Sequence, residues 1–192
     1  MTTTQEWDAA AVLATNGLAG RWGLLDALMI GLAKYVHFVF AATLLLVWLI
    51  RTARAQRLAL IAGIAALLAL GAGQVIGLSF PRLRPYQALP VHLLVPHAPD
   101  SSFPSDHATL AFAVTAILWR LDRRLGAALL ALSCVLAFAR VFIGAHYPTD
   151  VVGGAILGSG VAAIVLALSE RGPGRRAIDF IITILRQLRV AA

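Results

Sequence analysis

The sequence contains little charge and a single cysteine. Only 13% of its 192 residues are charged, whereas soluble proteins average about a quarter. Cys134, which lies inside an apolar run, is the only cysteine, so a disulfide framework is excluded. Hydrophobic residues make up 60% of the chain and the mean hydropathy is +0.84, more than one small soluble core can bury. The composition therefore predicts an integral membrane protein.

Lysine is also scarce: fifteen of the sixteen basic residues are arginine. In a soluble chain the net charge of +7 would suggest a nucleic-acid partner. Here the arginines cluster between apolar runs, where membrane topology explains them, so we expect no nucleic acid. The first residues, MTTTQEWDAA, lack the basic and apolar regions of a signal peptide, and we expect a mature chain.

Apolar runs predict an all-α, polytopic bundle of five to six transmembrane helices in a single domain, residues 1–192. A hydrocarbon core of about 30 Å requires roughly twenty apolar residues per helix. The third run is short and polar at its start, so its helix is expected to begin inside a protein-lined cavity. The five clear runs are residues 36–50, 58–78, 108–119, 125–139 and 151–168.

Both ends of the chain predict helices that lie on the membrane surface. Residues 7–30 are apolar but interrupted by Asn16, Arg21 and Asp26, which favours interfacial helices over a weak extra span. Residues 177–190 alternate a polar face with an isoleucine-rich face, as an amphipathic helix on the cytoplasmic surface does. Packing on a partner subunit is the alternative for this helix, and the oligomeric state stays open.

The arginine clusters predict the orientation of the bundle. With five spans, the clusters within residues 51–57, 120–124 and 171–176 fall on one side, which the positive-inside rule assigns to the cytoplasm. The connections 80–106 and 141–150 then fall on the opposite side.

Those two connections contain a set of polar residues suited to phosphate. The segments are RLRPYQ, DSSFPSDHA and ARVFIGAHYPTD. Arg84 and Arg140 carry planar guanidinium groups that match phosphate oxygens. Pro104 suits the first position of a helix, whose free N–H groups at residues 105–107 would form an anion site. We therefore expect a dianionic ligand such as phosphate.

Two histidines and an aspartate add catalytic chemistry. His146 and Asp150 share one face if their turn is helical, and Pro148 suits a helix start. A carboxylate beside one imidazole nitrogen makes the other nitrogen a nucleophile. His107 is then available as the general acid for the leaving oxygen. These three groups could also bind zinc, but zinc would leave the arginine pair unexplained, so we expect no metal.

These residues resemble the type 2 phosphatidic acid phosphatase superfamily. Its motifs are Lys, six residues, Arg-Pro; Pro-Ser-x-His; and Ser-Arg, five residues, His, three residues, Asp. The chain matches them at residues 84–85, 104–107 and 140–150. It departs from them at Gly77, where the family has Lys, and at Ala139, where it has Ser. Arg82 is the candidate to replace the missing lysine.

Within the superfamily, HLLVPHAPDSSFPSDHATLAFA and GAHYPTDVVGGAILG resemble the bacterial undecaprenyl-diphosphatase branch linked to bacitracin resistance. The resemblance implies hydrolysis of undecaprenyl diphosphate to the monophosphate, which recycles the carrier lipid for peptidoglycan biosynthesis. It places the enzyme in the bacterial cytoplasmic (inner) membrane with its site facing the periplasm or cell exterior. The substrate partner is then a polyprenyl diphosphate lipid in the bilayer.

The same resemblance implies residue roles without any cofactor. His146 would form a phosphohistidine, Asp150 would orient it, and His107 would protonate the leaving group. The phosphate-binding candidates are Arg84, Ser105, Asp106 and Arg140, and the candidates for the head group or its surroundings are Arg82, Gln87, His92 and His97.

Two other functions are consistent with part of the pattern. The same chemistry would serve another lipid phosphate, such as phosphatidylglycerophosphate or phosphatidate. A small anion transporter would place polar groups along a path across the membrane, whereas residues 58–78 and 151–168 contain no ionisable residue. The pattern therefore favours an enzyme with a one-sided site.

Overall fold

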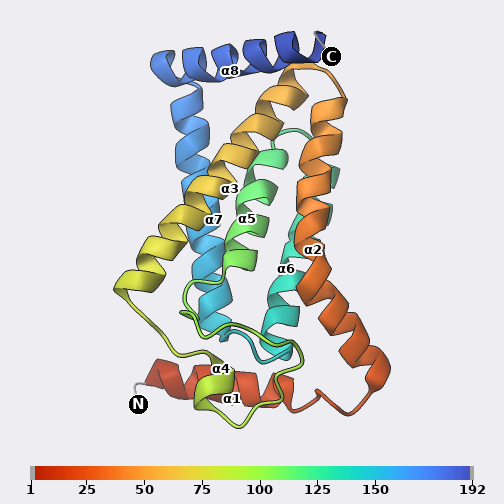
Figure 1. The fold of residues 1–192 in the computed structure, drawn as a ribbon, viewed down its shortest axis with the longest axis vertical. Coiled ribbons are helices and arrows are strands. Elements are labelled where there is room, and N and C mark those ends of the chain that lie inside the picture. The colour runs from red at the N-terminus through yellow and green to blue at the C-terminus, as the bar shows by residue number, and fades with distance from the viewer. Residues whose placement is uncertain (1–2, 191–192) are drawn as a thin grey trace.

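The computed structural model describes residues 3–190, which form an all-α bundle (Figure 1). Helices α2, α3, α5, α6 and α7 run along its long axis, while α1 and α8 lie across opposite ends. The helices are α1 (Thr3–Asn16), α2 (Gly23–Leu49), α3 (Ala53–Ser79), α4 (Pro85–Ala88), α5 (Asp106–Leu118), α6 (Arg123–Phe142), α7 (Pro148–Ser169) and α8 (Gly172–Val190).

Four helices, α2, α3, α6 and α7, are long and apolar enough to cross a membrane. The expected first span was wrong at its start, because α2 begins at Gly23 rather than at residue 36. The carboxylate of Asp26 accepts a hydrogen bond from the backbone N–H of Gly20, so this charge sits in the first turn of the helix. Residues 23–30 therefore belong to the first span, and of the residues 7–30 expected on the membrane surface only those in α1 lie across an end of the bundle.

Helix α5 occupies the centre of the bundle (Figure 1). Its 13 residues extend for about 20 Å at 1.5 Å per residue, which is shorter than a hydrocarbon core. Most of its side chains are buried, including Ala108, Val114 and Leu118. Neighbouring helices thus cover this short helix, and a long polar loop precedes it.

Two glycines bring the start of α7 against the start of α5. A Cβ atom at Gly154 would lie 2.6 Å from the carbonyl oxygen of Ser105, and one at Gly158 would lie 2.2 Å from that of Thr109. Close helix packing of this kind requires small residues. The contact lets the backbone N–H of Ser105 donate to the carbonyl of Asp150 at 3.0 Å, which joins the two predicted site segments.

The arginine clusters share one end of the bundle, as their spacing predicts. Arg54 donates to the carbonyl of Arg120, and Arg57 donates to that of Ser169, each at 2.5 Å. Helix α8 lies across this end, with its residues Ile178 and Ile182 buried against the bundle. We call this region the basic end; the predicted site lies at the other end.

Candidate active site

His146 lies between α6 and α7, buried beside Arg84. Its Nδ1 is 2.9 Å from the carbonyl oxygen of Ser102, and its Nε2 is 3.0 Å from Nη1 of Arg84. A carbonyl only accepts and a guanidinium only donates, so these partners assign the proton to Nδ1 and a lone pair to Nε2. Nε2 is therefore the nitrogen of this histidine with a lone pair available for attack.

The electrostatic surroundings keep that imidazole neutral. Burial, followed by the positive charges of Arg140 and Arg84, holds the pKa of His146 well below its ordinary value of 6.5. A neutral imidazole retains its lone pair, which nucleophilic attack requires.

Asp150 supports His146 less directly than the spacing predicts. Helix α7 begins at Pro148 as expected, so His146 lies just before the helix, with its Nδ1 3.6 Å from Oδ2 of Asp150. That oxygen accepts hydrogen bonds from the backbone N–H of Tyr147 and the hydroxyl of Ser102. Asp150 thus holds the residue before α7 and the residue whose carbonyl fixes the imidazole.

Arg140 is a buried cation that forms no ion pair with the described residues. It lies near the end of α6, is 3% exposed, and its Nε and Nη2 atoms have no hydrogen-bond partner among the described residues. The hydroxyl of Ser105 is likewise buried and unpartnered. Because unpaired buried polar groups are costly, these atoms indicate a place for an anion.

Helix α5 begins later than expected. Pro104 was predicted at its first position, but Ser105 is the N-cap and Asp106 the first helical residue. The N–H of Ser105 already bonds to the carbonyl of Asp150, which keeps this residue outside the helix. The first-turn N–H groups of Asp106 and His107 remain for an anion.

The loop after α3 holds Arg84 from several sides. Its Nε donates to Asp100 at 2.7 Å, and its Nη1 donates to the carbonyl of Ala145 at 3.0 Å. Burial alone would raise the pKa of Asp100, but the hydrogen bond and charge of Arg84 outweigh it, so the pKa lies below its ordinary value. Asp100, absent from the predicted set, is thus an ionised anchor for Arg84.

The remaining candidates support this loop. The side-chain oxygen of Gln87 accepts from the N–H of Arg84 at 2.9 Å. Nδ1 of His97 lies 3.4 Å from Asp100, and the backbone of His92 bonds to the side chain of Asn16 in α1.

Asp106 faces α3, where its Oδ2 accepts from Gln74 at 2.9 Å. It lines a cavity of about 240 Å³ together with Asp100 and Pro104. This cavity lies between α3 and the loop, and its lining residue Asp100 is the one that binds Arg84. A Cβ atom at Gly77 would lie 3.3 Å from the loop, so the position of the missing lysine is packed against it.

Arg82 makes a network that sequence reasoning missed. Its Nη1 donates to Asp150 and to the hydroxyl of Thr149, and its Nη2 donates to Asp8 of α1, each at 2.7 Å. Asp8 is 1% exposed and also accepts from the N–H of Thr149 at 3.1 Å. Two carboxylates therefore hold Arg82. One belongs to Asp150, which lies beside His146, and the other belongs to Asp8 of α1.

His37, like Asp100 and Asp8, lies at this end of the bundle but outside the predicted set. Its ring meets that of His107 edge-on, with centroids 5.0 Å apart, and its Nδ1 is buried without a partner among the described residues. An ionisable residue within a membrane span was the available signal. His107 itself lies within electrostatic range of Arg140 and His146.

Within residues 3–190, no three side chains of His, Cys, Asp or Glu converge in a way that could hold a metal ion. At this end, Arg82 and Arg84 bind carboxylates, whereas Nε and Nη2 of Arg140 have no hydrogen-bond partner among those residues. The arrangement is suited to binding a phosphoryl group and to attacking it with an imidazole.

Comparison with known proteins gives consistent results. The model of the PAP2 superfamily matches residues 58–172. Undecaprenyl-diphosphatase BcrC of Bacillus subtilis is 36% identical over 153 residues, which cover 80% of this chain and 77% of that protein.

Two solved structures share the fold. Aquifex aeolicus LpxE superposes with a TM-score of 0.68 at 25% identity, over 82% of this chain and 93% of that one. A transmembrane PAP2-type phosphatidylglycerolphosphate phosphatase from Bacillus subtilis superposes with a TM-score of 0.62 at 23% identity, over 88% of each chain.

Proposed function

The chain belongs to the PAP2 superfamily, and from that membership we propose that this membrane lipid phosphatase hydrolyses undecaprenyl diphosphate to undecaprenyl phosphate and inorganic phosphate. The reaction would recycle the carrier lipid of peptidoglycan synthesis. The 36% identity to an undecaprenyl-diphosphatase supports this substrate. The single observation that carries the chemistry is the unpaired, buried Arg140 beside a neutral His146.

The reaction proceeds by two displacements at phosphorus. Nε2 of His146 attacks the terminal phosphorus, the bond to the bridging oxygen breaks, and His107 protonates the departing lipid phosphate. Water then attacks the phosphohistidine with His107 as base, which releases phosphate and restores the imidazole. No step requires a metal or another cofactor.

The cations stabilise the charge that develops on the phosphoryl oxygens. Arg140 already has unpaired donors, and Arg84 exchanges its contact with Nε2 of His146 for a phosphoryl oxygen when substrate enters. The hydroxyl of Ser105 and the first N–H groups of α5 add further donors. Preoriented donors of this kind are usually the largest catalytic term.

Asp8 and Arg82 act on this chemistry through Asp150. Arg82 bridges the two carboxylates, and Asp150 in turn fixes Ser102 and Tyr147 around the imidazole. The role of Arg82 is then to position Asp150, in place of the phosphate contact suggested for it by the missing lysine.

The proposed orientation in the membrane rests on the difference in charge between the two ends. Four helices are long enough to span; if α5 is counted as a fifth span, the positive-inside rule assigns the basic end to the cytoplasm and the site to the cell exterior or periplasm. The lipid tail stays in the bilayer while only the head group reaches the polar site.

Phosphate release by the purified protein tests the proposal. The substrates are undecaprenyl diphosphate, phosphatidylglycerophosphate and phosphatidate, each with EDTA present. We expect the highest kcat/KM with undecaprenyl diphosphate, loss of turnover in His146→Ala, and no effect of the chelator. A clear preference for another lipid phosphate would replace the substrate but keep the chemistry, whereas chelator sensitivity would contradict the mechanism.

A further inference from the structure

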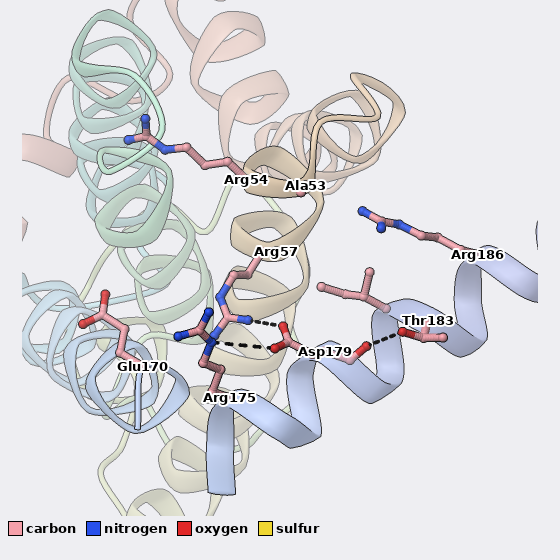
Figure 2. A pocket seen from close by; sticks show the side chains of 9 residues that line it. Ala53, Arg54, Arg57, Glu170, Arg175, Asp179, Thr183 and Arg186 are labelled. Atoms are coloured by element: carbon pink, nitrogen blue, oxygen red, sulfur yellow. Dashed lines mark hydrogen bonds and ion pairs between the residues drawn. The ribbon is translucent and has the colours of Figure 1, made fainter. Parts of the chain in front are cut away.

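The basic end contains a hollow that the reaction does not use. A cavity of about 550 Å³ lies between the start of α3, the end of α7 and α8 (Figure 2). Four arginines and two carboxylates are among its lining residues. These six are Arg54, Arg57, Glu170, Arg175, Asp179 and Arg186.

The charges in this cavity do not balance. Asp179 pairs with Arg57 at 2.5 Å and lies 3.8 Å from Arg175, so one carboxylate serves two guanidinium groups (Figure 2). Arg186 bonds to the side-chain oxygen of Gln56 at 2.9 and 2.6 Å. Arg54 bonds to a backbone carbonyl. Among the described residues, both guanidinium groups are therefore partnered by neutral oxygens, which leaves an excess of positive charge.

An apolar hollow of about 530 Å³ lies directly beside the cavity, between α2 and α3. Leu185 of α8 lines this hollow while the next residue, Arg186, lines the cavity. On α3, Gln56 binds Arg186, and Leu60, one turn later, lines the hollow. We call this hollow the apolar groove; its wall also includes Trp48 of α2.

We propose that the cavity and the apolar groove together bind an anionic phospholipid of the membrane leaflet at the basic end. Guanidinium groups match phosphate oxygens, and basic pockets at helix ends recognise anionic head groups. The adjoining groove accepts an acyl chain, which a free phosphate ion lacks. This site is separate from the active site and does not depend on which lipid is hydrolysed there.

Fluorescence quenching tests the site, because Trp48 lines the groove. The purified protein is titrated in detergent with phosphatidylglycerol brominated in its acyl chains, and separately with brominated phosphatidylcholine. The Trp48→Phe variant is titrated in the same way, and its quenching, which comes from the other tryptophans, is subtracted. We expect Trp48 to be quenched at about tenfold lower concentration of the anionic lipid, since a charge-assisted contact is worth about one such factor.

Two arginine variants distinguish a site from general attraction. Arg186→Gln is expected to remove the tenfold preference, whereas Arg176→Gln, the same change on α8 at a residue lining neither hollow, keeps it. Arg54→Gln is the second test if Arg186→Gln does not yield folded protein. Equal loss in Arg176→Gln, or equal quenching by the two lipids in the wild type, would overturn the proposal.

Inorganic phosphate provides the remaining arm of the experiment. Phosphate can contact only the cavity, because it lacks the acyl chain that would bind the apolar groove. We therefore expect it to bind more weakly than the lipid, so that equimolar phosphate leaves lipid quenching of Trp48 unchanged. Displacement of the lipid by equimolar phosphate would mean that the ligand is the free anion, and would contradict a lipid site.

Discussion

Both ends of the bundle are built from arginine and aspartate, yet they differ in burial. At the basic end, the side chains of Arg57 and Asp179 are 24% and 55% exposed. At the active-site end, Arg84 and Arg140 are 4% and 3% exposed. Exposed ion pairs are screened and contribute little, whereas buried charges act strongly on their neighbours. The same residue types therefore give an adaptable surface at one end and a preoriented site at the other.

The difference comes from what covers each end. The long loop before α5 and the whole of α1 close over the active site, and they supply Asp100 and Asp8 to the arginines there. At the basic end, α8 covers the bundle with a few isoleucines and leaves its polar face open. The following predictions test this contrast, starting with the largest effect.

Arg140→Met is expected to reduce kcat by roughly 10³-fold, since it removes preoriented donors to the phosphoryl group. The same change removes an unpaired buried charge, so the melting temperature of the substrate-free protein is expected to stay the same or to rise. Arg140→Lys should restore activity only in part, because an ammonium lacks the planar fork. A variant that loses stability as well as activity would contradict an unpaired Arg140.

Asp8→Asn is expected to destabilise the protein by roughly 3 kcal/mol, because it breaks an ion pair whose carboxylate is buried. Since Asp8 reaches Asp150 through Arg82, kcat should fall as well, with little change in KM. Chemical denaturation and steady-state kinetics measure the two effects. Glu6→Gln removes an exposed carboxylate from the same helix and is the matched control. An equal response in both variants would rule out the network.

Acid should weaken the active-site end through His146. Its folded pKa is lowered, mainly by burial, so below about pH 6.5 the unfolded chain binds a proton that the folded chain does not. Stability therefore falls as pH drops through that range, by at most about 1.4 kcal/mol per pH unit from this group. His146→Gln should flatten the slope between pH 5 and 7, measured by denaturation. An unchanged slope would show that His146 is not held neutral.

Asp179→Asn, at the basic end, is expected to cost less than about 1 kcal/mol, because the pair with Arg57 is exposed to solvent. Its effect should shrink further at high salt, and turnover should stay at the wild-type level. Denaturation at low and high ionic strength provides the measurement. A loss as large as that of Asp8→Asn would remove the distinction between the two ends.

The sequence predicted the parts of this molecule that local patterns encode. Apolar runs located α3, α6 and α7, and the motif spacings selected Arg84, Arg140 and His146, which the structure places in or beside one buried site. The start of α2 was missed because a charged residue, Asp26, was read as an interruption, whereas its carboxylate bonds back to the turn.

The missed residues share a different property. Asp8 and His37 lie in helices outside the three motifs, and their partners lie far away in the sequence. Asp100 lies closer to Arg84 in sequence, but within an irregular loop that has no periodicity. Only the packing of α1, α2 and the loop against the bundle brings these groups to the site, and no local pattern reports such packing.

The proposed reaction depends on transfer of the phosphoryl group to Nε2 of His146, between Arg84 and Arg140. The most direct test is rapid mixing of the enzyme with undecaprenyl diphosphate, an alkaline quench that preserves phosphohistidine, and mapping of the phosphate by tandem mass spectrometry. We expect a phosphate on His146 in the wild type and none in His146→Gln. A phosphate on His107, or full turnover by His146→Gln, would contradict it.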